Sequence, residues 1–224
     1  MKVVYEDNHI IIVNKDSGEI VQGDKTGDKP LSEMVKDYIK VKYDKPGNVF
    51  LGVVHRLDRP VSGLVVFAKT SKALSRLNNM FRNGDVHKTY WALTKGIPAN
   101  SEDTLINWLV RNENQNKSYV YDHEVQDSKK AVLSYRVLGR TDNYTLFEIK
   151  LKTGRHHQIR CQMSHIGCPI KGDLKYGARR SNPDGSISLL SQKVEFIHPV
   201  SGQTISVEAI LPDNSLFKKI TTPM

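Results

Sequence analysis

Three short clusters of polar residues contain the side chains that could perform chemistry. The first is HRLDRPVSG, residues 55–63, in which one carboxylate, Asp58, stands between Arg56 and Arg59. Nearby cations favour the ionised form of a carboxylate, which makes Asp58 a candidate nucleophile. A proline and a glycine favour a turn here, and a loop at a strand end holds polar groups where a ligand can reach them. The alternative is a turn held only by local ion pairs.

The second cluster is TGRHHQIR, residues 153–160, which leads from a predicted strand into a predicted helix. Thr153 or Gly154 is predicted to begin the helix. Arg155 and His157 would then lie near the helix N-terminus, where backbone N–H groups attract anions. This cluster therefore predicts a binding site for a negatively charged ligand.

A metal site is not indicated by the histidines or the cysteines. Consecutive helical residues point about 100° apart, so His156 and His157 cannot chelate one ion as an i, i+4 pair would. His165 lies too far along the chain, and no carboxylate falls at metal-ligand spacing. Cys161 and Cys168 form no CxxC pair and are too few for a disulfide framework, so we expect both to be small buried or half-buried residues.

The third cluster is KTYWA, residues 88–92, on a predicted strand. Alternation places Lys88 and Tyr90 on one face of the strand and Trp91 on the other. A tyrosine beside a lysine could stack on a nucleobase, but a strand tyrosine is more often packed inside the protein. The cluster alone leaves both interpretations open.

The charge balance indicates a polyanionic partner. The chain of 224 residues has 33 Lys and Arg against 24 Asp and Glu, a formal net charge of +9. The positive excess is spread along the chain rather than held in a tail, which favours nucleic acid as the partner. A solvated basic surface is the alternative. The apolar stretches are too short to cross a bilayer, and the N-terminus lacks a signal-peptide layout, so a cytoplasmic location is expected.

The elements that must position these clusters are mainly strands. Strand-like patterns outnumber helical ones, so we expect an α+β fold with a mixed, largely antiparallel sheet and a few flanking helices. Helical spacing covers residues 31–39, 73–81 and 158–166, with Ser71 predicted to cap the second helix and Gly84 to end it. The predicted strands are residues 3–6, 10–14, 49–55, 64–68, 90–94, 133–138, 145–151, 194–198 and 204–209.

No repeat, low-complexity tract or linker interrupts the chain, so we expect one continuous unit. Residues 141–143 are predicted to form a short turn between two strands. The segment from Pro98 to Lys130 is polar and irregular, and we interpret it as an excursion between the two halves of the sheet.

In this order and spacing, the three clusters resemble the RluA family of RNA pseudouridine synthases. PIKGD at residues 169–173 and the pair Tyr176-Gly177 continue the resemblance, which extends from Ile10 to Pro212. Residues 13–18 resemble the family's lysine-proline-x-glycine element, and residues 196–199 its closing strands. The resemblance implies a sheet split by a central catalytic cleft. We expect a single catalytic domain over residues 1–224. Many relatives carry a small N-terminal RNA-binding domain, but no residues stand ahead of residue 1 to form one, so no such appended domain is expected.

The resemblance implies roles for individual residues. Asp58 matches the catalytic aspartate of the family, Tyr90 its active-site tyrosine, and Arg160 the basic residue that pairs with that aspartate. Arg56 matches the arginine that enters the RNA where the target nucleotide is flipped out. The other candidates for contact with RNA are His55, Arg59, Lys88, Arg155 and His157.

Three positions depart from the family pattern. Asp16 stands where proline is usual, Val61 where threonine is usual, and Leu190 where the closing leucine-histidine-alanine element has its histidine. None of them coincides with the three catalytic matches. The departures therefore concern contacts with the substrate rather than activity.

The activity implied is isomerisation of specific uridines in structured ribosomal or transfer RNA. Nothing is oxidised and no group is imported, so neither a cofactor nor a metal is expected. Breaking the bond between N1 and C1′ needs a carboxylate at the sugar, as in glycosidases. Asp58 could add to C1′ or remove the 2′ hydrogen, and the sequence does not choose. The target nucleotide must leave the duplex, and Arg56 would fill the gap.

A monomer is expected. Two other functions fit parts of the pattern. A catalytically silent RNA-binding relative is possible, although the intact set of Asp58, Tyr90 and Arg160 argues against it. A metal-dependent nuclease would need clustered carboxylates, which the sequence does not show.

Overall fold

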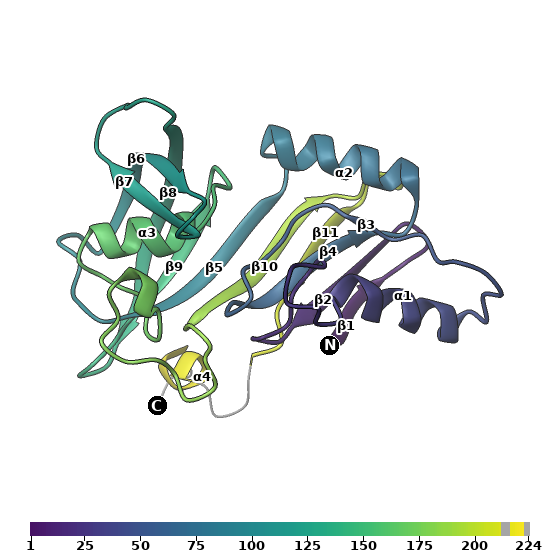
Figure 1. Cartoon of the computed structure of the whole chain (residues 1–224), viewed down its shortest axis with the longest axis horizontal. Coiled ribbons are helices and arrows are strands. Elements are labelled where there is room, and N and C mark those ends of the chain that lie inside the picture. The colour runs from purple at the N-terminus through teal and green to yellow at the C-terminus, as the bar shows by residue number, and fades with distance from the viewer. Residues whose placement is uncertain (212–215, 222–224) are drawn as a thin grey trace. The chain divides into compact units, whose positions relative to one another are not determined.

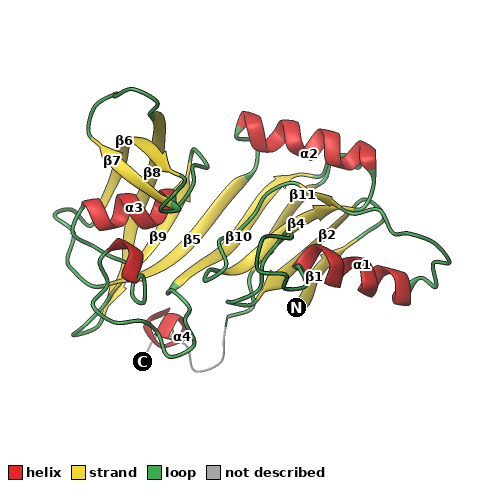
Figure 2. Cartoon of the chain, viewed as in Figure 1, coloured by secondary structure: helices red, strands yellow, loops and turns green. Residues whose placement is uncertain are grey.

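The computed structural model describes residues 1–211 and 216–221, and the chain divides into two compact units (Figure 1). Unit 1 comprises residues 1–86 and 191–210, and unit 2 comprises residues 87–190 together with the described residues from 211 onward. In each unit antiparallel strands are accompanied by a few helices, which confirms the α+β class (Figure 2).

Unit 1 is built on two strands rich in β-branched residues, a composition that favours extended backbone. Its strand order is β1-β2-β4-β10, with β3 paired to β4 and β11 paired to β10. Every residue of β2 is buried, as is nearly all of β4. The elements are β1 (Lys2–Glu6), β2 (Ile10–Lys15), α1 (Leu31–Lys42), β3 (Gly52–Val53), β4 (Ser62–Ala68), α2 (Ser71–Asn83), β10 (Leu189–Ile197) and β11 (Thr204–Glu208).

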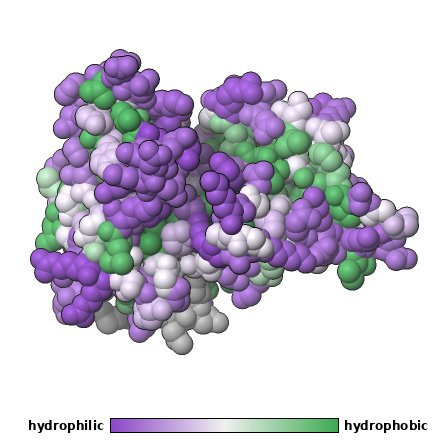
Figure 3. Space-filling view, viewed as in Figure 1, coloured by the Kyte–Doolittle hydropathy of each residue, from purple (hydrophilic) through white to green (hydrophobic). Residues whose placement is uncertain are grey.

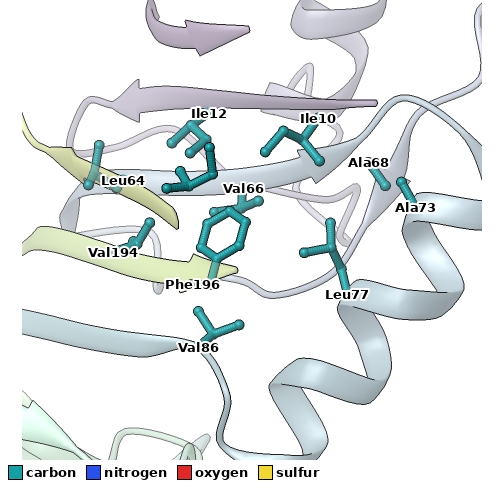
Figure 4. Close-up of a cluster of buried hydrophobic side chains, with 11 residues drawn as sticks. Ile10, Ile12, Leu64, Val66, Ala68, Ala73, Leu77, Val86, Val194 and Phe196 are labelled. Atoms are coloured by element: carbon teal, nitrogen blue, oxygen red, sulfur yellow. The ribbon is translucent and has the colours of Figure 1, made fainter. Parts of the chain in front are cut away.

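Helix α2 packs its apolar side on the sheet of unit 1 (Figure 4). The helix ends at Gly84, as predicted, with a φ of 84°. The predicted cap at Ser71 is wrong by one residue. Thr70 has the extended backbone that an N-cap needs, and its hydroxyl accepts the Ala73 N–H at 3.1 Å. The buried cluster consists of Ile10, Ile12, Leu64, Val66, Ala68, Ala73, Leu77, Val86, Val194, Phe196 and Ile205.

A buried carboxylate ties helix α1 to strand β1. Glu6 accepts hydrogen bonds from Lys42 and Lys69, both at 2.7 Å, from Tyr43 at 2.9 Å and from Tyr38 at 3.1 Å. Burial alone would raise the pKa of this carboxyl group, but the hydrogen bonds from Lys42, Lys69 and Tyr43 lower the pKa to about 2. Glu6 therefore stays ionised and holds two cations in place.

Unit 2 is an antiparallel sheet in the order β5-β9-β8-β6-β7. The predicted turn at residues 141–143 is confirmed, because Thr141 N–H donates to Tyr144 O at 2.8 Å between β8 and β9. The elements are β5 (His87–Thr94), β6 (Glu102–Asn112), β7 (Lys117–Tyr121), β8 (Lys129–Arg140), β9 (Thr145–Leu151), α3 (Gln158–His165), the 3-10 turn η1 (Leu174–Tyr176) and α4 (Leu216–Thr221).

The interpretation of Pro98–Lys130 as an irregular excursion is wrong. The segment contains β6, β7 and the start of β8, and residues 113–116 form the turn of the β6–β7 hairpin. The sequence of β6 does not alternate between apolar and polar residues, because its buried side includes the polar Asn107 and its exposed side includes the apolar Ile106. Burial of Asn107 is possible because its amide oxygen accepts a hydrogen bond from Gln162 at 2.8 Å.

Other differences from the predicted elements are smaller. The strand predicted over residues 49–55 is reduced to Gly52–Val53, and α4 was not predicted. Pro212, where the family resemblance ends, lies outside the described residues. Within the described part of the chain, every helix is too short or too polar to cross a membrane. The face drawn in Figure 3 is mainly hydrophilic, with scattered hydrophobic residues.

Glu6→Gln should lower the free energy of unfolding by about 2 kcal/mol at pH 7, because the amide cannot neutralise the two lysines. A carboxyl pKa that folding depresses from 4.5 to about 2 stabilises the protein above pH 4.5. That stabilisation is lost as the pH falls toward 2, so the difference between variant and wild type should shrink between pH 5 and pH 3. Urea denaturation at several pH values measures it.

Glu33→Gln is the matched control, because Glu33 is an exposed acid whose partner Lys36 lies on the same helix. This substitution should change stability by less than about 0.5 kcal/mol at every pH. A pH-independent cost of Glu6→Gln would contradict the assigned role of the carboxylate.

Candidate active site

The loop with Asp58 lies between β3 and β4 in unit 1. Leu57 is buried and Asp58 is half-buried, so the loop anchors itself with the leucine and presents the carboxylate at the surface. Val61 N–H donates to Asp58 O at 3.0 Å, which closes a turn directly after the aspartate. The loop therefore has a defined backbone at the candidate nucleophile.

A buried lysine holds this loop from within unit 1. The Nζ of Lys15, which is wholly buried, donates to the carbonyl oxygens of Arg59 at 3.1 Å and Val61 at 2.5 Å. Burial lowers the pKa of the Lys15 amine to about 8, and the negative charges of Glu19 and Asp58 oppose the shift. Lys15 therefore fixes the backbone after Asp58 and places a positive charge near its carboxylate.

Gly63 and His55 fix the two ends of the loop. Gly63 has a φ of +110°, and a Cβ at this position would lie 2.3 Å from Ser191 O, so only glycine fits. His55 Nε2 accepts the N–H of Val66 at 2.9 Å, and its ring stacks on Phe81 at 4.8 Å. The structure thus gives His55 an internal role, and its contact with RNA stays a prediction.

The two arginines beside Asp58 differ in their surroundings. Arg59 Nε donates to Gly18 O at 3.1 Å, and its guanidinium also pairs with Asp28. Arg56 is exposed, and within the described part of the chain its guanidinium has no hydrogen bond or ion pair. Arg56 is therefore available to a ligand, whereas Arg59 is already engaged in unit 1.

In unit 2, strand β5 places Lys88 and Tyr90 on one face, as predicted. Tyr90 is opposite Ile149 of β9 and is only 6% exposed. A Cβ on Gly154 would lie 3.6 Å from Lys88 Nζ, so this amine lies beside the second polar cluster. Burial lowers the pKa of Lys88. The strand thus brings KTYWA next to TGRHHQIR.

Arg160 is buried in unit 2 and forms a bidentate ion pair with Asp173. Its Nε lies 2.7 Å from Asp173 Oδ2 and its Nη2 2.9 Å from Oδ1, and the two side chains are 7% and 1% exposed. The guanidinium carbon lies 5.1 Å from the centre of the Tyr176 ring. The predicted pairing of Arg160 with Asp58 stays a prediction.

Sequence reasoning did not predict that Asp173 and Tyr176 contact Arg160. It used PIKGD and Tyr176-Gly177 only as parts of the family pattern and assigned neither of them a role. The signal that could have found them is the acidic residue in a short motif soon after Arg160. That signal names a candidate partner, but only tertiary structure shows which cation it meets.

His157 lies inside unit 2 rather than at its surface. Tyr176 Oη accepts the N–H of Ser118 at 2.8 Å and forms a hydrogen bond with His157 Nδ1 at 2.9 Å. Burial and the nearby charge of Arg160 lower the pKa of His157 to about 2, so its ring is neutral. The structure therefore gives His157 a packing role, and its contact with RNA stays a prediction.

Helix α3 begins at Gln158, as the helical spacing over residues 158–166 predicted, but neither Thr153 nor Gly154 opens it. His157 is the N-cap, with a φ of 52°. The Thr153 hydroxyl does not cap the helix; it bonds to the Gln158 side chain at 2.8 Å. At this helix N-terminus His157 and Gln158 are buried, whereas Arg155 is exposed. The anion site predicted here stays a prediction.

A pocket of about 480 Å³ in unit 2 collects several basic side chains. Arg155 is exposed at its rim, and its Nε donates to Lys130 O at 3.0 Å. A pocket with several cations suits a phosphate group. Its basic lining residues are Arg111, Lys129, Arg155 and His156, and its acidic ones are Glu113, which pairs with Arg111, and Asp127.

Metal ligands do not gather in either unit, as far as the chain is described: no group of three or more His, Cys, Asp or Glu residues could hold an ion. Both cysteines are buried thiols, as predicted. Independence from metals nevertheless stays a prediction.

A loop that presents a carboxylate, a strand tyrosine beside a lysine and a basic pocket are features that suit an enzyme acting on a polyanion. Residues 9–165 match the family described as RNA pseudouridylate synthase. The chain belongs to this family, as its resemblance to the RluA type predicted, and it is an isomerase.

Two curated relatives illustrate the similarity. An uncharacterized RNA pseudouridine synthase of Bacillus subtilis is 33% identical over 219 residues, which cover 96% of this chain and 70% of the relative. A protein of Xanthomonas campestris named ribosomal large subunit pseudouridine synthase D is 32% identical, covering 96% and 67%.

A third curated relative and a solved structure extend the comparison. A tRNA pseudouridine synthase C of Pectobacterium carotovorum is 30% identical, covering 93% of this chain and 58% of the relative. The solved human RNA pseudouridylate synthase domain containing 4 shares the fold, with a TM-score of 0.79 at 22% identity. This alignment covers 95% of this chain and 89% of the human one.

The buried pair of Arg160 and Asp173 should show strong coupling in a thermodynamic cycle. Arg160→Met alone should lower the free energy of unfolding by about 3–5 kcal/mol, because it leaves the buried carboxylate of Asp173 without its bidentate partner. Asp173→Asn alone should also be costly, because it removes two charge-assisted hydrogen bonds of the buried guanidinium. The double variant should lower the free energy of unfolding by clearly less than the sum of the two single effects, because neither charge of the buried pair remains. Urea denaturation of the four proteins measures the coupling, and simple additivity would refute the pairing.

Proposed function

We propose that the chain converts uridine to pseudouridine in structured RNA with Asp58 as the catalytic carboxylate. The observation that carries this proposal is the Asp58 loop in a chain of this family. Its carboxylate is half-buried, and a buried lysine, a turn hydrogen bond and a glycine fix the backbone around it. A nucleophile needs such a fixed position, because small misplacements of reacting atoms cost much of the rate.

Asp58 acts at the sugar of the target uridine, where the bond between N1 and C1′ must break. The carboxylate either adds to C1′ or removes the 2′ hydrogen, and both routes remain open. Tyr90 holds the base during its rotation, and Tyr90 or a water removes the proton from C5 when the new bond has formed. No cofactor or metal takes part.

Arg160 supports Asp58 by keeping its carboxylate charged and aimed. The support for this role is the rigid setting of Arg160 in unit 2. The bidentate contact with Asp173 uses Nε and Nη2, and the Tyr176 ring packs beside the guanidinium. An arginine fixed in this way keeps its orientation without reorganisation during the reaction.

The substrate is ribosomal or transfer RNA, as the names of the relatives from Xanthomonas and Pectobacterium suggest. Arg56 fills the space left when the nucleotide is flipped out. Arg155 and the basic pocket around it bind phosphates. This proposal also includes the central cleft in the sheet, a single catalytic domain over residues 1–224, a monomer and a cytoplasmic location.

Asp58→Asn should slow pseudouridine formation by at least about a hundredfold, because the amide keeps the size of the side chain but lacks its negative charge. Single-turnover assays on cellular RNA, with EDTA present, measure new pseudouridine and RNA cleavage together. Asp37→Asn is the matched control, since Asp37 is an exposed acid of helix α1 in the same unit, and it should leave the rate unchanged.

A rate for Asp58→Asn within tenfold of wild type would remove Asp58 from its role. Wild-type protein that binds RNA without forming pseudouridine would be a silent relative. RNA cleavage would indicate a nuclease.

Arg56→Met should slow turnover more on an RNA whose target uridine is paired than on one whose target is already unpaired, because less unstacking is needed there. Arg59→Met is the control. Its guanidinium is engaged by Gly18 and Asp28, so we expect no such dependence on pairing. Single-turnover rates on matched paired and unpaired targets test this. An equal response of both variants would refute the role given to Arg56.

A further inference from the structure

One face of the β6–β7 hairpin exposes aromatic side chains. Residues opposite one another in an antiparallel sheet share a face. Trp108 is opposite Tyr121, and Val110 is opposite Tyr119. Tyr119 and Tyr121 are each 39% exposed. We call this surface the aromatic face; it consists of Ile106, Trp108, Val110, Asn112, Lys117, Tyr119, Tyr121, Lys130 and Val132.

The aromatic face does not hold the hairpin in the fold. The other face does so: Leu109 packs with Ala131 of β8 and Cys161 of α3, and Val120 packs against this cluster. The outer face of an antiparallel sheet normally carries polar residues, because it meets water. Exposed aromatic and β-branched residues on such a face are typical of a binding surface.

The charges on the aromatic face favour an anionic partner. Lys130 is opposite Trp108, and Lys117 Nζ lies 5.4 Å from the centre of the Tyr119 ring. Among the residues of this face two are cationic and none is acidic. Aromatic rings bind unpaired nucleobases by stacking, and neighbouring lysines bind their phosphates. A protein partner could pack against the aromatic rings, but it would have to place acidic residues beside both lysines.

We propose that the aromatic face binds an unpaired segment of RNA, with bases stacked on Trp108, Tyr119 and Tyr121 and phosphates at Lys117 and Lys130. This inference rests on the proposed function, since it gives the enzyme a second contact with its substrate. None of these residues belongs to the site inferred from the sequence. The face would select RNAs that carry a single-stranded segment beside the modified region.

The affinity test uses the double variant Tyr119→Ser/Tyr121→Ser. Stacking on one aromatic ring is worth about tenfold in affinity. The variant should therefore bind a mixed-sequence single-stranded 12-mer RNA at least about tenfold more weakly, and a duplex of the same sequence within about twofold of wild type. Phe50→Ser, which removes a 48% exposed aromatic residue of unit 1, should change neither affinity. Fluorescence anisotropy measures binding, and circular dichroism confirms folding.

A second readout does not depend on the tyrosines or on activity. The chain has two tryptophans, Trp91 and Trp108, so Trp91→Phe leaves Trp108 as the sole indole emitter. Base stacking should quench Trp108 emission when the single-stranded 12-mer is added, and the duplex should quench it much less. Unchanged emission at saturating single-stranded RNA would overturn the inference.

The remaining outcomes separate the inference from the proposed function. If wild-type protein forms pseudouridine and the tyrosine variant binds single strands as well as wild type does, the inference fails while the function stands. If no RNA is modified but Trp108 is quenched and the tyrosine variant binds weakly, the face binds RNA and the proposed function fails. Concentration-dependent dimers in sedimentation that the tyrosine variant abolishes would show an interface between copies, which overturns the inference.

Discussion

The candidate active site depends on one buried charge, the ammonium group of Lys15. Removing it from water is costly, and the lowered pKa of about 8 reflects that cost. The cost is offset because the amine donates to the carbonyls of Asp16, Arg59 and Val61. These contacts join the end of β2 to the turn after Asp58, so the position of the candidate nucleophile follows from the most deeply buried strand of unit 1.

Unit 2 also contains a buried cation that is held by hydrogen bonds. Arg160 is buried, and its charge is balanced by a carboxylate that meets it through two hydrogen bonds. An unpaired guanidinium could not remain there, and a loosely paired one would lose its orientation. By contrast, the exposed Arg56 has no partner within the described residues. The buried cations thus supply rigidity, while the exposed one is available for the substrate.

The β6–β7 hairpin shows how one strand pair can serve structure and binding at once. Its inner face packs on α3 and is fixed by Leu109 and the hydrogen-bonded Asn107. Because the inner face suffices to hold the hairpin, the outer face can present Trp108 and the tyrosines without loss of the fold. A strand allows such a division because its successive side chains point to opposite faces.

The sequence by itself determined the strands with clean apolar patterns, helix α2 with its end at Gly84, the basic character and the family. These follow from local periodicity, from the φ > 0 that glycine alone adopts readily, and from the order of motifs. Only the tertiary structure decided that Arg160 meets Asp173, that His157 is buried and that β6 and β7, within residues 98–130, form a hairpin. Each of these depends on which residue, distant in the sequence, packs over a polar group or pairs with it. Contacts of this kind produce no periodic pattern in the sequence.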